Sequence, residues 1–208
     1  MRKLITEFIG TFFLVLVIGM VVFNKEALAP LAIGSVLMCM VFAGAHVSGA
    51  HYNPAVTLAV LLRGRISLKD AISYIIVQII GAAAAAEMVI YLSPDKIPAA
   101  AVDMSSMLNA VIAEALGTFA LAYVVLNVAT AKNTLGNMFY GLSIGFTVLS
   151  MAYAFGSISG GAFNPAVAVG ISMLHIASWS NFWIYLVGCF GGAAIAALVF
   201  RINNPEDK

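Results

Sequence analysis

Two copies of one short motif carry polar side chains that could act on a solute. Asn53-Pro54-Ala55 and Asn164-Pro165-Ala166 each precede an apolar run. Asn is a preferred helix N-cap and Pro is favoured at the first helical position, so each motif predicts the start of a short helix. The Asn side-chain carbonyl would accept from N–H groups of its own first turn. The side-chain NH₂ is then free to donate into a cavity, which predicts hydrogen bonding to a solute.

Two carboxylates, Glu7 and Glu114, lie inside apolar runs, where acidic groups are costly and usually functional. We favour the interpretation that each is a buried acceptor for N–H groups of a nearby loop, and a proton relay is the alternative. His46 and His51 flank the first motif, but no third histidine or thiolate follows at ligand spacing, so we predict no metal and no cofactor. No nucleophile, base and orienting group recur near one another, and we predict no enzyme.

The composition places these residues in a membrane protein. The chain of 208 residues is 62% hydrophobic and 9% charged, with a mean hydropathy of +1.03, whereas soluble domains contain roughly a quarter charged residues. The formal net charge of +1 and the lack of basic runs argue against nucleic acid as a partner. The expected surroundings are the lipid bilayer.

Hydropathy and breaker residues predict the elements that must position the motifs. Apolar runs of about 20 residues can span a bilayer, and we predict such spans at 4–23, 31–45, 68–92, 107–130, 135–155 and 179–200. The runs 54–62 and 165–177 are too short to cross and should enter and return. Non-helical backbone at membrane depth is tolerated around a water-filled cavity. The predicted fold is therefore all-α, with six transmembrane helices and two re-entrant half-helices around a cavity.

The chain contains an internal repeat. Glu-Phe-Ile-Gly-Thr-Phe at 7–12 resembles Glu-Ala-Leu-Gly-Thr-Phe at 114–119, and the stretches 48–56 and 159–167 share Ser-Gly and Asn-Pro-Ala-Val. We predict one domain, 1–208, made of repeats 1–98 and 99–208 and joined near 93–106. Because each repeat holds three spans, the second must be inverted relative to the first. The two half-helix starts then meet at the midplane, where their positive dipole ends repel cations.

Basic residues predict the orientation, because Lys and Arg are enriched in cytoplasmic loops. With the N-terminus inside, Lys25 and Lys96 face outward. The cytoplasmic side then receives Arg2, Lys3, Arg63, Arg65, Lys69, Lys132, Arg201 and Lys208. We therefore expect a multi-pass protein of the cell membrane with both termini cytoplasmic.

The doubled Ser-Gly-x-x-aromatic-Asn-Pro-Ala-Val motif, with Glu-x-x-Gly-Thr-Phe opening each half, resembles the aquaporin or major intrinsic protein family over essentially the whole chain. The resemblance implies a homotetramer whose monomers each pass water or another small neutral solute, with half-helix dipoles excluding cations. It also implies that Glu7 and Glu114 are structural acceptors. The backbone carbonyls that it places along the pore belong to Gly49, Ala50, His51, Tyr52, Gly160, Ala162 and Phe163.

The chain departs from the family at the outer constriction. Most members follow the second Asn-Pro-Ala with Arg, and this chain has Val167. Aligned with the family pattern, the other filter positions fall on Ile33, Ala152 and Gly161. We therefore predict a wide, apolar and uncharged filter.

The cues to the solute conflict. Glycerol facilitators have Asp where this chain has Ala168, and the Phe182-Trp183 pair resembles the water-selective branch. The wide filter instead suits glycerol, urea or similar solutes as well as water. The alternatives are a solute-selective facilitator with little water flux, a secondary transporter built on inverted repeats, and a structural membrane-junction protein. Gly188 and Gly192, at a G-x-x-x-G spacing, indicate close helix packing within the monomer or in a tetramer.

Overall fold

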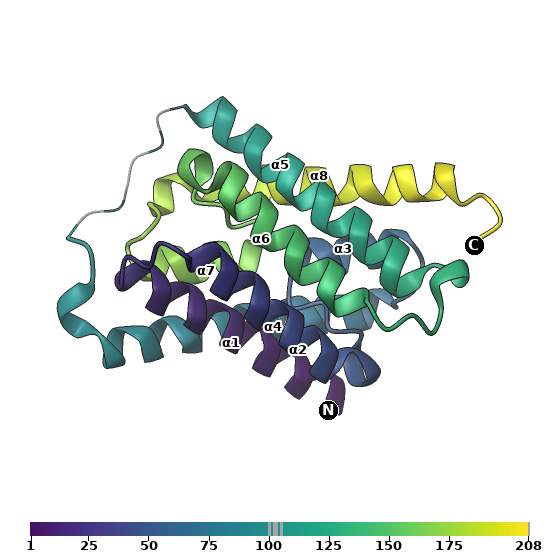
Figure 1. Cartoon of the computed structure of the whole chain (residues 1–208), viewed down its shortest axis with the longest axis horizontal. Coiled ribbons are helices and arrows are strands. Elements are labelled where there is room, and N and C mark those ends of the chain that lie inside the picture. Colours follow the sequence, from purple (N-terminus) through teal and green to yellow (C-terminus); the bar gives the residue numbers. More distant parts are fainter. Residues whose placement is uncertain (100, 102–103, 105, 208) are drawn as a thin grey trace.

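The computed structural model describes residues 1–99, 101, 104 and 106–207, and this part of the chain is all-helical (Figure 1). Within it, six helices are long and apolar enough to cross a membrane. They are α1 (Arg2–Phe23), α2 (Ala29–Ser48), α4 (Leu68–Leu92), α5 (Met107–Val125, continued by a π-helical turn, Leu126–Thr130), α6 (Tyr140–Ser159) and α8 (Phe182–Asn203). Two short helices, α3 (Pro54–Leu62) and α7 (Pro165–Met173), complete the predicted set.

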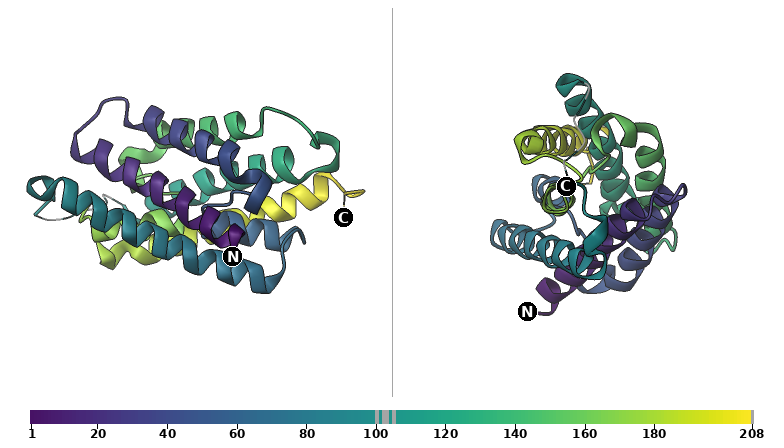
Figure 2. Two further views of the ribbon diagram at one scale, coloured as in Figure 1. Left: turned by 90° about the horizontal axis from the view of Figure 1, so that it is seen from below. Right: turned by 90° about the vertical axis from the view of Figure 1, so that its left-hand side faces the viewer.

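The two halves of the chain interlock through the short helices. Among the long helices, α1 packs on α4, α2 on α6 and α5 on α8. Helix α3 from the first half packs on α8 and α5 of the second half, whereas α7 packs on α4 and α1 of the first. Figures 1 and 2 show these short helices inside the bundle of long ones. Each half therefore supplies part of the wall around the other half's re-entrant segment.

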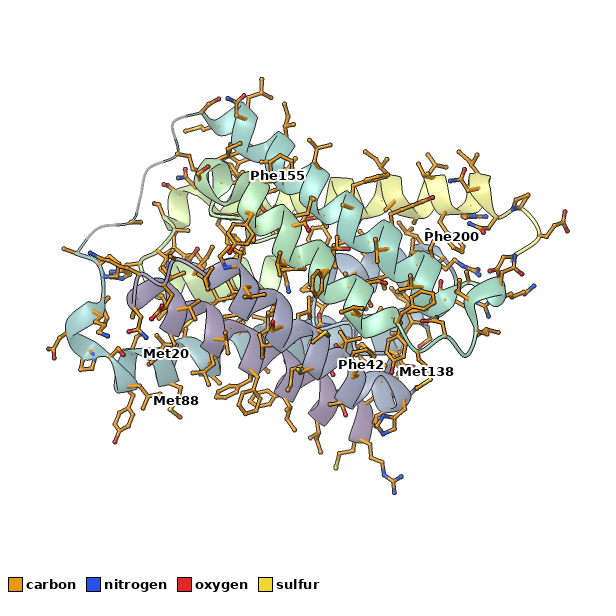
Figure 3. All side chains as sticks on the ribbon, viewed as in Figure 1. Met20, Phe42, Met88, Met138, Phe155 and Phe200 are labelled. Atoms are coloured by element: carbon orange, nitrogen blue, oxygen red, sulfur yellow. The ribbon has the colours of Figure 1, made fainter. Side chains whose placement is uncertain are left out.

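The surface of the long helices is apolar, as lipid requires. Large aliphatic and aromatic side chains are exposed along them, among them Ile76, Ile80, Phe146, Val187 and Ile195. Figure 3 shows side chains standing out all round the ribbon, and its labels mark the two ends of the bundle. Phe42, Met138 and the buried Phe200 lie toward one end, and Met20, Met88 and Phe155 lie toward the other. In water the exposed apolar side chains would be a liability, but in a bilayer they face hydrocarbon.

The first of these two ends holds most of the basic residues, and we call it the basic end. Lys3, Arg65 and Lys132 line a common vestibule there, with a volume of about 730 Å³. Lys96 lies beyond the opposite end of α4, where its Nζ donates to Asn24 Oδ1. Of the predicted features, Lys208 and residues 100, 102, 103 and 105 of the joining segment lie outside the described residues.

Glycines bring α8 close to α5. A Cβ at Gly188 would lie 2.9 Å from the carbonyl oxygen of Val111, and one at Gly192 would overlap the carbonyl oxygen of Ala115. A Cβ at Gly81 would likewise lie 2.8 Å from the carbonyl oxygen of Phe8, where α4 crosses α1. Both members of the G-x-x-x-G pair are therefore used for packing within the chain.

Several predicted boundaries differ from the structure: α2 ends at Ser48 and not at 45, α6 ends at Ser159 and not at 155, and α8 ends at Asn203 and not at 200. Two further differences have a clear physical cause. Helix α6 begins at Tyr140 and not at residue 135, because the preceding residues form a turn against the end of α5. In that turn Thr134 Oγ1 donates to the carbonyl of Asn127, Asn137 Nδ2 donates to that of Val128, and Gly136 has φ of 79°. Helix α7 ends at Met173 and not at 177, because His175 adopts a left-handed conformation with φ of 56°.

Candidate functional site

Both short helices begin at the paired motifs. Asn53 Oδ1 accepts from the backbone N–H of Ala55 at 2.8 Å, and Asn164 Oδ1 accepts from that of Ala166 at 2.9 Å. Pro54 and Pro165 occupy the first turn of each helix, where a missing N–H does no harm. The N-cap geometry agrees with the sequence interpretation.

The two asparagine amides also join the two halves of the chain. Asn53 Nδ2 donates to the carbonyl of Phe163, and Asn164 Nδ2 donates to the carbonyl of Tyr52, both at 2.9 Å. These bonds place the N-terminal ends of α3 and α7 beside each other, so two positive dipole ends converge. Each amide has two N–H groups, and both asparagines line the central cavity. One donor per asparagine therefore remains for a solute.

The loops that precede the asparagines have the same unusual backbone in both halves. Left-handed φ values occur at Gly49, Ala50 and Tyr52, and again at Gly160, Gly161 and Phe163. For Tyr52 (49°) and Phe163 (47°) this conformation costs about 1–3 kcal/mol each and persists only where the surroundings enforce it. The surrounding hydrogen bonds explain how it is enforced.

Glu7 holds the first loop through four donors. Its Oε1 accepts from Ser48 Oγ at 2.6 Å and from the backbone N–H of His51 at 3.0 Å. Its Oε2 accepts from the N–H of Tyr52 at 2.7 Å and from Gln78 Nε2 at 2.8 Å. The carboxylate is fully buried; three of these bonds hold the loop, and the fourth ties the carboxylate to α4.

Glu114 does the same for the second loop. Its Oε1 accepts from Ser159 Oγ at 2.6 Å and from the N–H of Ala162 at 2.9 Å, and its Oε2 accepts from the N–H of Phe163 at 2.6 Å. Cys189 Sγ, at the position that matches Gln78, is the fourth donor at 3.5 Å. Both carboxylates are therefore buried and accept hydrogen bonds from the loops.

The glycine of each Glu-x-x-Gly-Thr motif makes room for the aromatic residue of its loop. A Cβ at Gly10 would overlap the ring of Tyr52, and one at Gly117 would overlap the ring of Phe163. These contacts explain why a carboxylate and a glycine recur at fixed spacing in α1 and α5. The motif fixes the loop on two sides.

The loops and short helices surround a cavity of about 170 Å³, room for a small number of water molecules. The predicted filter residues Ile33, Ala152, Gly161 and Val167 all line it. So do Asn53 and Asn164. Most of the remaining wall is aliphatic: Leu14, Ile18, Val22, Leu37, Val41, Val56, Leu121, Val125, Ile144, Val148, Ile171 and Ile176. His51 and Val125 line both this cavity and the vestibule at the basic end.

The predicted pore carbonyls fall into three groups. Those of Ala50, His51, Gly160 and Ala162 belong to residues that line the cavity. Gly49 instead lines the vestibule. Tyr52 lines the cavity and, like Phe163, offers its carbonyl to an asparagine of the other half, a pairing that spacing alone did not indicate.

Several residues that line the cavity or hold its loops were not predicted from the sequence. The aliphatic residues of α1, α5 and α6 that line the cavity have no signature that separates them from lipid-facing neighbours. Gln78 and Cys189 were recognisable only as polar side chains in apolar spans. Within the described residues, no group of three or more His, Cys, Asp or Glu side chains could hold a metal ion.

Comparison with known proteins places the chain. The model of the family described as Major intrinsic protein matches residues 1–200. The glycerol uptake facilitator protein-like 6 of Lactiplantibacillus plantarum is 37% identical over all of both chains, and aquaporin NIP1-2 of Arabidopsis thaliana is 33% identical over all of this chain and 76% of its own. The X-ray structure of the aquaglyceroporin from Plasmodium falciparum superposes with a TM-score of 0.83, at 24% identity, over 99% of this chain and 97% of its own.

The match to the solved structure shows that the chain has the same fold as that protein. The family model and the two relatives show common descent, because the model matches residues 1–200 and the relatives are 37% and 33% identical over the whole chain. Proteins of this family are channels for water or small solutes. The chain is therefore a multi-pass membrane protein of the major intrinsic protein family.

Proposed function

We propose that the chain is a passive channel for water and for other small neutral solutes of the size of glycerol or urea. The observation that carries this proposal is the pair of asparagine amides, from Asn53 and Asn164, in a cavity whose wall is otherwise largely aliphatic. Two donors at convergent positive dipole ends favour a neutral molecule with a lone pair and repel a cation.

We propose Ile33, Ala152, Gly161 and Val167 as the selectivity filter of this channel. None of these side chains is charged or able to hydrogen-bond, so the filter would discriminate by size alone. The names of the relatives support a channel that accepts more than one kind of solute: one is a glycerol uptake facilitator protein-like protein, and another is an aquaporin. A facilitator with little water flux is the second candidate, favoured by the first of these names.

A secondary transporter is disfavoured by the state of the two buried carboxylates. Coupling to a proton would need a titratable group that is open to the translocation path. Glu7 and Glu114 each accept three hydrogen bonds from their loops and a fourth from a long helix, and both are fully buried. Their partners suit a fixed structural role.

A permeability panel on proteoliposomes tests the proposal. Stopped-flow light scattering would compare water, glycerol, urea and a larger polyol with and without an ion gradient. We expect water flux with a low activation energy, slower flux of glycerol or urea, and no effect of the gradient. Glycerol flux without water flux would support the facilitator, and dependence on the gradient would support the transporter. Permeability equal to that of empty liposomes would remove the channel proposal.

We further propose that the protein assembles as a homotetramer in the cell membrane with both termini in the cytoplasm. The first part rests on family resemblance, and the second rests on the gathering of basic residues at one end of the bundle. The mass of the protein in detergent, after subtraction of bound detergent, tests the assembly.

A further inference from the structure

A single carboxylate in the segment after α8 joins three parts of the basic end. Asp207 Oδ1 accepts from Arg63 Nη2 at 2.6 Å and from Arg65 Nη2 at 3.2 Å. Its Oδ2 accepts from the backbone N–H of Lys132 at 2.7 Å, in the turn between α5 and α6. The carbonyl of Glu206 also accepts from Lys132 Nζ at 3.3 Å. The segment after α8 is thus bonded to the ends of both α3 and α5.

Arg63 gives this contact its importance for the pore. Arg63 is the C-cap of α3, and Asn53 is the N-cap of the same helix. The side chain of Arg63 is only 2% exposed, and its guanidinium lies over the ring of Phe200 of α8, 4.7 Å from the ring centre (Phe200 is labelled in Figure 3). A buried cation that loses its counter-charge is strongly destabilised. Asp207 supplies that counter-charge.

The second half of the chain is built differently at the matching position. Leu174, fully buried, follows α7 where Arg63 follows α3. The end of α7 is thus held by apolar packing, whereas the end of α3 depends on an ion pair with a distant segment. The end of α3 at the basic end is therefore held by the contacts of Asp207, which we call the fixing point, whereas the end of α7 is held by apolar contacts.

The fixing point lies beside the vestibule. Arg65, which follows α3, and Lys132, which follows α5, are both bonded to Asp207, and both line the vestibule. Ala129 and Thr130 of the π-helical turn line it as well. Val125, one turn earlier, lines both the vestibule and the central cavity. A movement of the turn 131–135 would therefore change the width of the passage at the basic end.

We propose that Asp207 is a positioning residue that keeps the basic end of the pore open by fixing the end of α3 to the turn between α5 and α6. Without its carboxylate, the buried Arg63 charge has no partner and the turn is released. The turn 131–135 can then move into the vestibule, and the side chains of Arg65 and Lys132, which already line it, can extend further across it. The passage narrows, and the permeability to the largest solute falls most. This inference rests on the proposed channel function.

The first test is the ratio of solute to water permeability, which does not depend on how much protein is active. The solute is the largest that the parent passes in the panel above. In Asp207→Asn we expect this ratio to fall at least about threefold, because losing one charge-assisted hydrogen bond can shift a two-state equilibrium by about tenfold. Asp207→Glu should keep the parent's ratio. So should Glu206→Gln, because Glu206 contributes its backbone carbonyl and not its carboxylate.

A second pair of variants releases the turn without leaving Arg63 unpaired. Lys132→Pro removes the N–H that Asp207 accepts, and it suits the first position of the 3-10 turn Lys132–Thr134 after Ala131, whose ψ is 141°. Lys132→Ala keeps the N–H and removes only the ammonium group. We expect the ratio to fall in Lys132→Pro and to stay unchanged in Lys132→Ala. This pair decides the matter if Asp207→Asn does not fold.

The outcomes separate the inference from the proposed function. If the parent passes water alone, the activation energy of water flux replaces the ratio, and it should rise in Asp207→Asn and in Lys132→Pro. A folded Asp207→Asn protein with an unchanged or higher ratio would overturn the positioning role, as would equal loss of both fluxes. If the parent has no flux of any kind, the proposed function itself fails, and this inference falls with it.

Discussion

At the scale of single residues, the proposed cation barrier depends on two amides. Asn53 sits where the positive ends of α3 and α7 converge, and its Nδ2 donates to the other half of the chain. Asn53→Asp replaces that donor with a negative charge and keeps the shape of the side chain. We expect a cation or proton leak above that of the parent, measured as liposome conductance or with a proton-sensitive dye. Asn133→Asp, in the exposed turn at the basic end, is the control and should leave the leak unchanged.

A second residue-scale prediction concerns the filter. Val167 is buried in the cavity wall at the start of α7, and Val167→Arg would add bulk and a fixed positive charge there. We expect the flux of glycerol or urea to fall much more than that of water, because water is smaller than either solute. Val167→Leu adds bulk alone, so the difference between the two variants reports the effect of charge. If Val167→Arg keeps the parent's solute-to-water ratio, the guanidinium has turned outward and Val167 is not at the constriction.

Asp207 yields a prediction about pH. The backbone N–H of Lys132 and the guanidinium of Arg63 hold the pKa of this carboxyl below its ordinary value of 3.8. A lowered pKa in the folded state stabilises the fold above the unfolded pKa, and this contribution is lost as the pH falls through the folded pKa. Between about pH 8 and pH 5 the carboxylate is ionised throughout. We therefore expect the ratio of solute to water permeability to be constant over that range, and a change there would show that another group titrates at the basic end.

At the scale of helices, the sequence predicted what local rules decide. The start of α3 at Pro54 and that of α7 at Pro165 follow from capping chemistry alone, and both agree with the structure. The start of α6 did not, because the turn before it is fixed by side-chain bonds to α5. No local rule contains those contacts. The bonds from Asn53 and Asn164 to the opposite halves escaped prediction for the same reason.

Helix packing gives a paired prediction at α8. Gly192 faces α5, where a Cβ would overlap the carbonyl of Ala115, whereas no heavy atom of the described residues lies within 4 Å of a Cβ placed at its neighbour Gly191. Gly192→Leu should therefore destabilise the protein by about 1–3 kcal/mol or more through overpacking. Gly191→Leu, on the exposed face, should be close to neutral. Thermal unfolding in detergent compares the two, and equal midpoints would mean that α8 does not pack on α5 as described.

At the scale of the whole molecule, the repeat explains both what was predictable and what was not. Matching motifs in the two halves predicted the fold class and the pairing of two half-helices, and the structure agrees with both. The repeat is imperfect, however, and its differences carry information. Gln78 is replaced by Cys189 and Arg63 by Leu174, so the two halves use different chemistry for the same geometric task. A symmetric pattern could not reveal which contact the segment after α8 makes.

Orientation is the last whole-molecule prediction. Among the described residues, Arg2, Lys3, Arg63, Arg65, Lys69, Lys132 and Arg201 belong to the basic end or to the helix ends that lead to it, whereas Lys25 and Lys96 follow the opposite ends of α1 and α4. Because Lys and Arg are retained on the cytoplasmic side, the basic end should face the cytoplasm.

Single cysteines test this orientation in a Cys39→Ser background, where the remaining Cys189 is fully buried. Asp95→Cys introduces an exposed thiol just after α4, and Glu206→Cys introduces one in the segment after α8. A membrane-impermeant maleimide added to intact cells should label Asp95→Cys and should leave Glu206→Cys unlabelled until the cells are permeabilised. The reverse pattern would mean that the basic end faces outward. The vestibule that Asp207 borders would then open on the external side.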